Sequence, residues 1–190
     1  VRPLIAKLRM IKQPAEITAI QQAIAITKQA LAEIEPLIAN AQNESDLDRE
    51  LNVRFAQAGV EHAFGPIIQA GLNTTILHYD KHSAPIGENT VVLFDIGAEY
   101  QHYAADISRT YVKGTNVRAQ KVVAAVADIQ KRLIAHVMPG RTWRELHEYY
   151  RRPSLSASVF SACFWAFCRA RHTRRRRLHG ALAGRHDHYG

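Results

Sequence analysis

The first 150 residues contain no cysteine, and both cysteines of the sequence, Cys163 and Cys168, lie near its end. A domain without cysteine has no disulfides and fits a reducing compartment. No apolar run approaches the roughly 20 residues that span a bilayer, since the longest, at 159–168, has about half that length. The N-terminus has no apolar segment of signal-peptide length. We therefore expect a soluble, cytoplasmic protein without a membrane partner.

Residues 151–190 contain no Glu, Lys, Ile, Asn or Gln. Of the 25 Lys and Arg residues of the chain, nine lie in this segment, and of the 17 acidic residues only Asp187 does. The first 150 residues therefore hold 16 basic and 16 acidic residues, and the net charge of +8 belongs to the end of the chain. We expect a neutral domain over 1–150 and an atypical Arg-rich tail over 151–190, because the tail shows no helical or strand period.

Apolar residues at helical spacing predict two helices near the start of the chain. Pro14 suits the first turn of a helix, and Pro36 ends or kinks it. A capping-box variant at Ser45–Asp48 predicts the start of a second helix, which Gly59 ends. The first helix has an apolar stripe of Ile17, Ile20, Ile24, Leu31, Ile34 and Ile38, and the second has Leu47, Leu51 and Phe55.

Two further helices are predicted after a β-rich stretch. One runs from about Val117 to Val137 and is ended by Pro139-Gly140, and a capping box at Thr142–Glu145 opens the next. Between the two pairs of helices, short β-rich runs predict a mostly antiparallel sheet. The longer helix has a stripe of Val122, Val126, Ile129, Leu133 and Val137, and the expected strands are 66–70, 75–78, 91–96 and 103–112.

Two aspartates lie within these expected strands. If 91–96 and 103–112 form a hairpin that turns near Tyr100-Gln101, Asp95 and Asp106 are directly opposed on one face. Two carboxylates so close repel each other, and a divalent cation would compensate, because carboxylate oxygens are good ligands for hard or borderline metals. In the alternative interpretation Asp95 ends a strand, Asp106 pairs with Arg109 or a backbone N–H, and no metal is bound.

The residues around these aspartates strengthen the first interpretation. The runs at 94–100 (Phe-Asp-Ile-Gly-Ala-Glu-Tyr) and 103–111 (Tyr-Ala-Ala-Asp-Ile-Ser-Arg-Thr-Tyr) closely resemble the pita-bread metallopeptidases, and within them the Xaa-Pro aminopeptidase (aminopeptidase P) type. Other stretches agree in order and spacing, and the resemblance covers about residues 8–150. These stretches are 9–17, 63–68, 71–79 and 137–140.

The resemblance implies an α/β (α+β) pita-bread fold, represented by its N-terminal half, an antiparallel sheet flanked by helices. It implies that Asp95 and Asp106 are the first two ligands of a dinuclear metal site, with Asp106 typically bridging the ions, and that His78 contacts the substrate. Outside the motif, a histidine before a tyrosine is more often a surface or core residue.

The implied reaction removes an N-terminal residue that precedes proline, using water activated by two divalent ions. Manganese is the first expectation, with cobalt or zinc as alternatives. The implied partner is a peptide with proline at its second position. A homodimer is compatible with the resemblance, and we expect no nucleic acid.

The sequence departs from the family pattern after residue 150. The complete site needs a further histidine and two later glutamates, but the last glutamate here is Glu148. We therefore expect an incomplete site and a chain that is weakly active or inactive. The alternative is a non-catalytic pita-bread binding module whose basic tail binds nucleic acid or anionic partners. Retention of Asp95, Asp106 and His78 argues against that alternative.

The change of composition near residue 150 suggests a frameshift, with a disordered tail as the alternative. An out-of-frame reading of G/C-rich codons would produce the Arg174–Arg177 run and the loss of Lys and Glu. Translation of the gene in all three frames past codon 150 tests the hypothesis. We expect another frame to restore a Gly-His segment and two later glutamates, and the hypothesis fails if no frame does.

Overall fold

The structure is a computed structural model that describes residue 5 and residues 8–150. Two compact units divide the chain at Thr115 and Asn116, and each is described by itself. The expected domain boundary at residue 150 coincides with the end of the described part, so it stays a prediction. The Arg-rich tail and both cysteines lie outside the described residues. Within the described part, no helix is long and apolar enough to cross a membrane.

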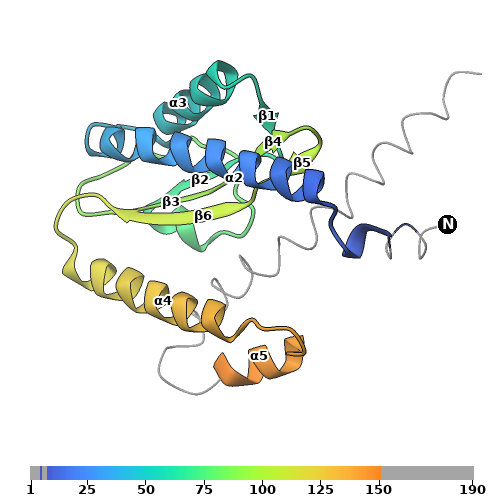
Figure 1. Ribbon diagram of the computed structural model, residues 1–190. Coiled ribbons are helices and arrows are strands. Elements are labelled where there is room, and N and C mark those ends of the chain that lie inside the picture. Colours follow the sequence, from blue (N-terminus) through green and yellow to red (C-terminus); the bar gives the residue numbers. More distant parts are fainter. Residues whose placement is uncertain (1–4, 6–7, 151–190) are drawn as a thin grey trace, which may run out of the picture. The chain divides into compact units, whose positions relative to one another are not determined.

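The first unit contains two long helices and two small antiparallel sheets (Figure 1). One sheet has the strand order β2-β3-β6 and the other has the order β1-β4-β5. In chain order the elements are α2 (Pro14–Ile34), the 3-10 helix η1 (Glu35–Ala39), α3 (Glu44–Gln57), β1 (Glu61–His62), β2 (Ile67–Ala70), the 3-10 helix η2 (Gly71–Thr75), β3 (Val91–Ile96), β4 (Ala98–Tyr100), β5 (Tyr103–Ala104) and β6 (Ile107–Val112).

Both long helices begin at a capping box. Helix α2 starts at Pro14, as expected, and the Gln13 N–H donates to Glu16 Oε2 at 2.7 Å. Helix α3 starts at Glu44, and its N-cap lies two residues before the cap expected at Ser45, because Asn43 and Asp46 form the box instead. Asp46 Oδ2 accepts from Asn43 N–H at 2.8 Å, and this hydrogen bond holds the pKa of Asp46 below its usual range. Both helices end as predicted: Pro36 converts α2 into η1, and Gly59 has φ +66° after α3.

The predicted apolar stripe of α2 is wrong over its first half. Ile17 and Ile24 are 45% and 37% exposed, whereas Leu31, Ile34 and Ile38 are buried as predicted. Helix α2 packs against β4 and β5, and several of the side chains that it buries are small, which allows the backbones to approach closely. These small buried residues are Ala19, Ala23, Thr27 and Ala30.

Thr27 joins α2 to the sheet. Its side chain is fully buried, and its Oγ1 donates to the Ala23 carbonyl at 2.8 Å and accepts from the Ala98 N–H at 2.9 Å. Ala98 begins β4, so this one hydroxyl satisfies a strand N–H that would otherwise be buried under the helix.

The strands at 67–70 and 91–96 agree with the prediction, but the expected strand at 75–78 is wrong. Residues 71–75 form η2, in which Thr74 Oγ1 donates to the Gly71 carbonyl and Thr75 Oγ1 to the Leu72 carbonyl, both at 2.8 Å. Such local side-chain bonds offer the backbone an alternative to a strand. The expected strand at 103–112 is also interrupted, into β5 and β6.

The side chains of the central strand β3 alternate between an apolar face of the sheet and a face with both polar and apolar residues. Val92, Phe94 and Ile96 are fully buried and belong to one core with residues of α2, η1 and α3. Since side chains alternate along a strand, Asp95 points to the opposite face. The register adds Gln69 of β2 and Ser108 and Thr110 of β6 to that face.

The second unit contains α4 (Val117–His136) and α5 (Trp143–Tyr150). Both match the predicted helices, and Asn116 caps α4 by accepting from the Ala119 N–H at 3.0 Å. The predicted Thr142–Glu145 capping box is confirmed, with the Thr142 N–H donating to Glu145 Oε2 at 2.7 Å, which keeps the pKa of Glu145 low. In the α4 stripe, the two end residues Val122 and Val137 are 40% and 49% exposed.

We expect the substitution Thr27→Val to lower the free energy of unfolding by about 1–3 kcal/mol, because the buried Ala98 N–H loses its acceptor. Thr18→Val is the matched control: Thr18 is exposed on the same helix and donates to the Pro14 carbonyl in the same way, but it holds no strand. Urea unfolding of both variants measures the difference. Equal losses would contradict the assigned role of Thr27.

Candidate metal centre

Asp95 occupies the middle of a three-stranded sheet. It lies between Ile67 of β2 and Ser108 of β6 and is 7% exposed. Ser108 Oγ donates to Asp95 Oδ1 at 3.2 Å. A nearly buried carboxylate in a central strand is costly unless other groups satisfy it, so this position is characteristic of a ligand or a hydrogen-bonded anchor.

The hairpin that carries Asp95 and Asp106 turns one residue later than predicted. Gln101 and His102 form the turn, with φ values of +47° and +68° that suit a two-residue hairpin loop. Each pairing therefore shifts by two residues, and Asp95 faces Ser108. The predicted direct opposition of Asp95 and Asp106 is wrong.

Asp106 directly precedes β6 and lies two residues before Ser108, the partner of Asp95. Continuing the alternation of β6 back by one residue puts Asp106 on the side of Ser108 and Asp95. Diagonal neighbours are about 7–8 Å apart, whereas opposed ones are about 4.5–5.5 Å apart, so the two carboxylates repel each other less than the prediction implied. Asp106 is half-buried and its Oδ2 is shielded from solvent.

Gly97 allows the two halves of the hairpin to meet at this point. A Cβ built on Gly97 would lie 1.9 Å from the Ala105 carbonyl oxygen and 3.1 Å from the Phe64 ring. Only glycine fits such an approach without a shift of backbone. Gly97 directly follows the strand that carries Asp95, and Ala105 precedes Asp106, so this close contact sets the spacing between the two aspartates.

His78 lies on an exposed turn after η2, in the left-handed backbone conformation with φ +58°. Its loop follows β2, and one side chain of β2 on the Asp95 face reaches it. Gln69, which shares that face, is 3% exposed and donates from Nε2 to the carbonyl of Ile76 at 2.6 Å. The loop is therefore tied to this face two residues before His78.

The donor set fits part of a metal site. Two carboxylates on one face suit a hard or borderline divalent ion. Among the described residues, however, no group of three or more His, Cys, Asp and Glu side chains is placed to hold an ion, so His78 does not join the aspartates in such a group. Asp95 and Asp106 can contribute to a metal centre but do not complete one.

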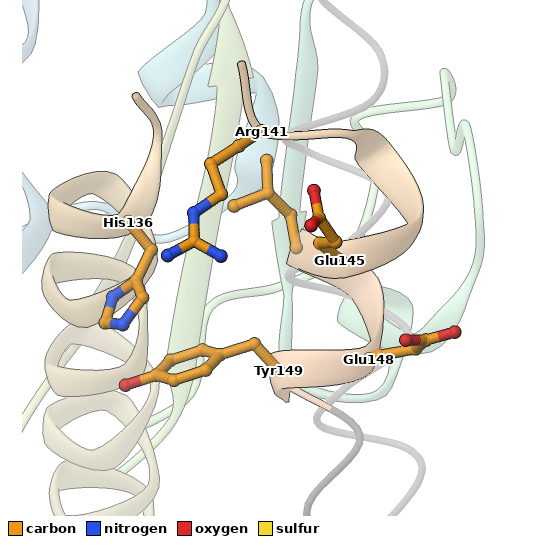
Figure 2. A pocket seen from close by; sticks show the side chains of 6 residues that line it. His136, Arg141, Glu145, Glu148 and Tyr149 are labelled. Atoms are coloured by element: carbon orange, nitrogen blue, oxygen red, sulfur yellow. The ribbon is translucent and has the colours of Figure 1, made fainter. Parts of the chain in front are cut away.

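A second polar site lies between α4 and α5, in the other unit (Figure 2). It is a hollow of about 310 Å³ in which the rings of His136 and Tyr149 stack with centroids 3.8 Å apart. Its lining contains none of the predicted site residues. The lining residues are His136, Arg141, Glu145, Leu146, Glu148 and Tyr149.

Comparison with known proteins gives the family. The model of metallopeptidase family M24 matches residues 18–179. The chain belongs to metallopeptidase family M24. The M24 match ends beyond residue 150, where the sequence resemblance was expected to stop. An Xaa-Pro aminopeptidase of Haemophilus influenzae is 34% identical over 155 residues, which cover 77% of this chain and 35% of that protein.

Solved structures confirm the fold. Aminopeptidase P from E. coli with the inhibitor Pro-Leu is similar with a TM-score of 0.73 and 27% identity, over 78% of this M24 chain and 34% of that one. A putative aminopeptidase P from Bacillus anthracis has a TM-score of 0.71 and 29% identity, over 88% and 38%. The expected pita-bread fold, with mixed helices and antiparallel sheet, is confirmed. The chain spans about a third of the length of these relatives.

The sequence-based prediction missed two side chains of the M24 chain's polar face. Ser108 donates to Asp95, and Gln69 anchors the loop of His78. Ser108 could have been found, because it lies two residues from Asp106 and so shares its face. Gln69 could not, because it bonds to Ile76 at the end of η2, inside the stretch 75–78 that the sequence pattern predicted as a strand.

We expect Gly97→Ala to destabilise the first unit by about 1–3 kcal/mol. The added Cβ would clash with the backbone carbonyl of Ala105, which cannot change rotamer as a side chain can. Gly65→Ala is the matched control, since nothing lies within 4 Å of a Cβ there, and it should be neutral or slightly stabilising. Urea unfolding and amide exchange at Ala105 measure both variants. Tolerance of Gly97→Ala equal to that of Gly65→Ala would contradict the close approach.

Proposed function

We propose that the chain is part of a metallo-aminopeptidase of the Xaa-Pro aminopeptidase type, which hydrolyses the N-terminal residue before proline in peptides. The observation that carries the proposal is Asp95, an almost buried carboxylate on the side of the sheet opposite the apolar core, with Asp106 two residues before its partner Ser108. Membership of family M24 and relatives named Xaa-Pro aminopeptidase support it.

Asp95 and Asp106 are proposed as two ligands of a dinuclear centre, with manganese as the expected ion. Divalent ions in such a centre supply Lewis-acid chemistry, which polarises a scissile carbonyl and lowers the pKa of water. Asp95 suits the role of a fixed ligand, because β2 and β6 hold it on both sides and Ser108 orients its Oδ1. The half-buried Asp106 extends the same polar face.

His78 is proposed to contact the peptide substrate. It is exposed, and the Gln69–Ile76 hydrogen bond ties its loop to the face that carries Asp95. An imidazole held beside a carboxylate-lined face can donate a hydrogen bond to a carbonyl or to the charge that develops on it during hydrolysis. The expected substrate is a peptide with proline at its second position. The proposed enzyme is cytoplasmic, and a homodimer is compatible with it.

In this proposal the chain contributes two carboxylates and not the full ligand set. Two carboxylates hold two ions against water less well than a full set does, so we expect weak metal binding. We expect Asp95→Asn and Asp106→Asn each to weaken Mn²⁺ binding by about tenfold or more. Titration calorimetry of the 190-residue chain measures this. Asp128→Asn is the matched control, since Asp128 pairs with Arg132 in the second unit and is not a proposed ligand.

Two outcomes would contradict the proposal. Equal Mn²⁺ binding by wild type, Asp95→Asn and Asp106→Asn would remove the metal assignment. Rapid Mn²⁺-dependent cleavage of an Xaa-Pro peptide by this chain would show that two carboxylates suffice, against the expectation of weak or absent activity.

A further inference from the structure

Glu44 is a completely buried carboxylate at the first residue of α3. An ionised side chain is rarely placed at zero exposure unless several donors replace its water. The sequence pattern did not single it out, because a glutamate in the first turn of a helix is ordinary. The hydrogen bonds that its side chain accepts, however, come from residues outside the helix.

The Glu44 carboxylate accepts hydrogen bonds from residues at the two ends of one loop. Oε1 accepts from the Ala70 N–H at 2.7 Å and from Asn73 Nδ2 at 2.9 Å. Oε2 accepts from the Ala84 N–H at 3.0 Å. Ala70 ends β2 and Asn73 lies in η2, while Ala84 lies at the far end of the same loop. One carboxylate thus holds both ends of the segment 71–84.

The backbone of α3's first turn reinforces this closure. The Glu44 N–H donates to the Ala84 carbonyl at 3.0 Å, and Asn43 forms an isolated antiparallel bridge with Pro85. The negative charge also sits at the N-terminus of a helix of 14 residues, where the helix dipole favours it. Glu44 is therefore held rigidly from its own side, and the loop is attached to it.

Between these attachment points lies the segment that carries His78. Additional contacts fix it partway: Gln69 Nε2 donates to the Ile76 carbonyl, and a ring nitrogen of His82 lies 3.0 Å from the Pro66 carbonyl oxygen. His78 itself is exposed at the outer turn with φ +58°, a conformation that costs a residue other than glycine free energy. The loop is thus fixed at its base and presents one imidazole at its tip.

We propose that Glu44 is a positioning residue: its carboxylate closes the base of the 71–84 loop and so fixes where His78 is presented. The relevance to catalysis rests on the proposed function, in which His78 contacts the peptide. The closure of the loop is a property of this chain and is testable without activity.

The test compares Glu44→Gln with Glu50→Gln in the 190-residue chain. The amide that replaces the Glu44 carboxylate places an N–H₂ group against an N–H donor, so the loop loses at least one of its three hydrogen bonds. Glu50→Gln makes the same chemical change on the same helix, where Glu50 pairs with Arg54 and not with the loop. Hydrogen–deuterium exchange of peptides covering 70–84 and 91–96, and the His78 imidazole NMR signal, assigned with His78→Asn, are the readouts.

We expect exchange in 70–84 to accelerate by about tenfold or more in Glu44→Gln, while β3 stays protected and Glu50→Gln resembles wild type. The His78 signal should move toward that of free histidine and sharpen only in Glu44→Gln. Unchanged loop exchange and an unchanged His78 signal in a folded Glu44→Gln would overturn the proposal.

If Glu44→Gln loses protection in β3 as well, exchange is measured in Asn73→Ala instead. This variant removes only one of the three hydrogen bonds that the Glu44 carboxylate accepts. Faster exchange at 71–80 with β3 intact supports the proposal, and unchanged exchange there overturns it. Failure of the proposed function would appear elsewhere, as absence of Mn²⁺ binding by the wild-type chain, and would leave the comparison of Glu44→Gln with Glu50→Gln intact.

Discussion

The strict alternation of side chains along β3 is the constraint on which the rest of the first unit depends. Its even-numbered residues, Val92, Phe94 and Ile96, are completely buried in the core that α2 and α3 cover. Burying these three side chains contributes about 1.5–3 kcal/mol each relative to exposure. That gain in free energy determines which face of the strand packs on the core. Successive side chains point to opposite faces of a sheet, so Asp95 must point away from the core.

The polar face is assembled from parts that are far apart in the sequence. Asp95 contributes a carboxylate from the centre, Ser108 a hydroxyl from β6 and Gln69 an amide from β2. Each has a definite task, since Ser108 orients the carboxylate and Gln69 ties down a loop. Glu44 binds the same loop from the first residue of α3. Stability and the candidate chemistry are thus divided between opposite faces of one sheet.

The fold was largely predictable wherever the hydrophobic period or a capping residue had no competing local interaction. The strand at 91–96, the start of α2 at Pro14 and the extent of α4 all follow from period and capping chemistry. Prediction failed where a local bond competed with the pattern. The threonines of η2 bond to nearby carbonyls, and the close packing on β4 selects alanines over isoleucines in α2.

The geometry of the candidate site could not be predicted from the sequence. The motif around Asp95 and Asp106 identified both aspartates, yet the spacing between them could not distinguish a turn at 100–101 from the observed turn at Gln101 and His102. The role of Glu44 was beyond prediction, because it depends on contacts with residues 26 to 40 positions away.

The two-residue turn at Gln101 and His102 has a consequence for how this region can evolve. If the loop kept two residues, one inserted or deleted residue in the hairpin would reverse the parity of β6 against β3, and Ser108 would then face the apolar core. Substitutions in the turn leave that parity untouched, provided that the new residues accept positive φ. Relatives that keep both aspartates should therefore vary here in residue type but not in length.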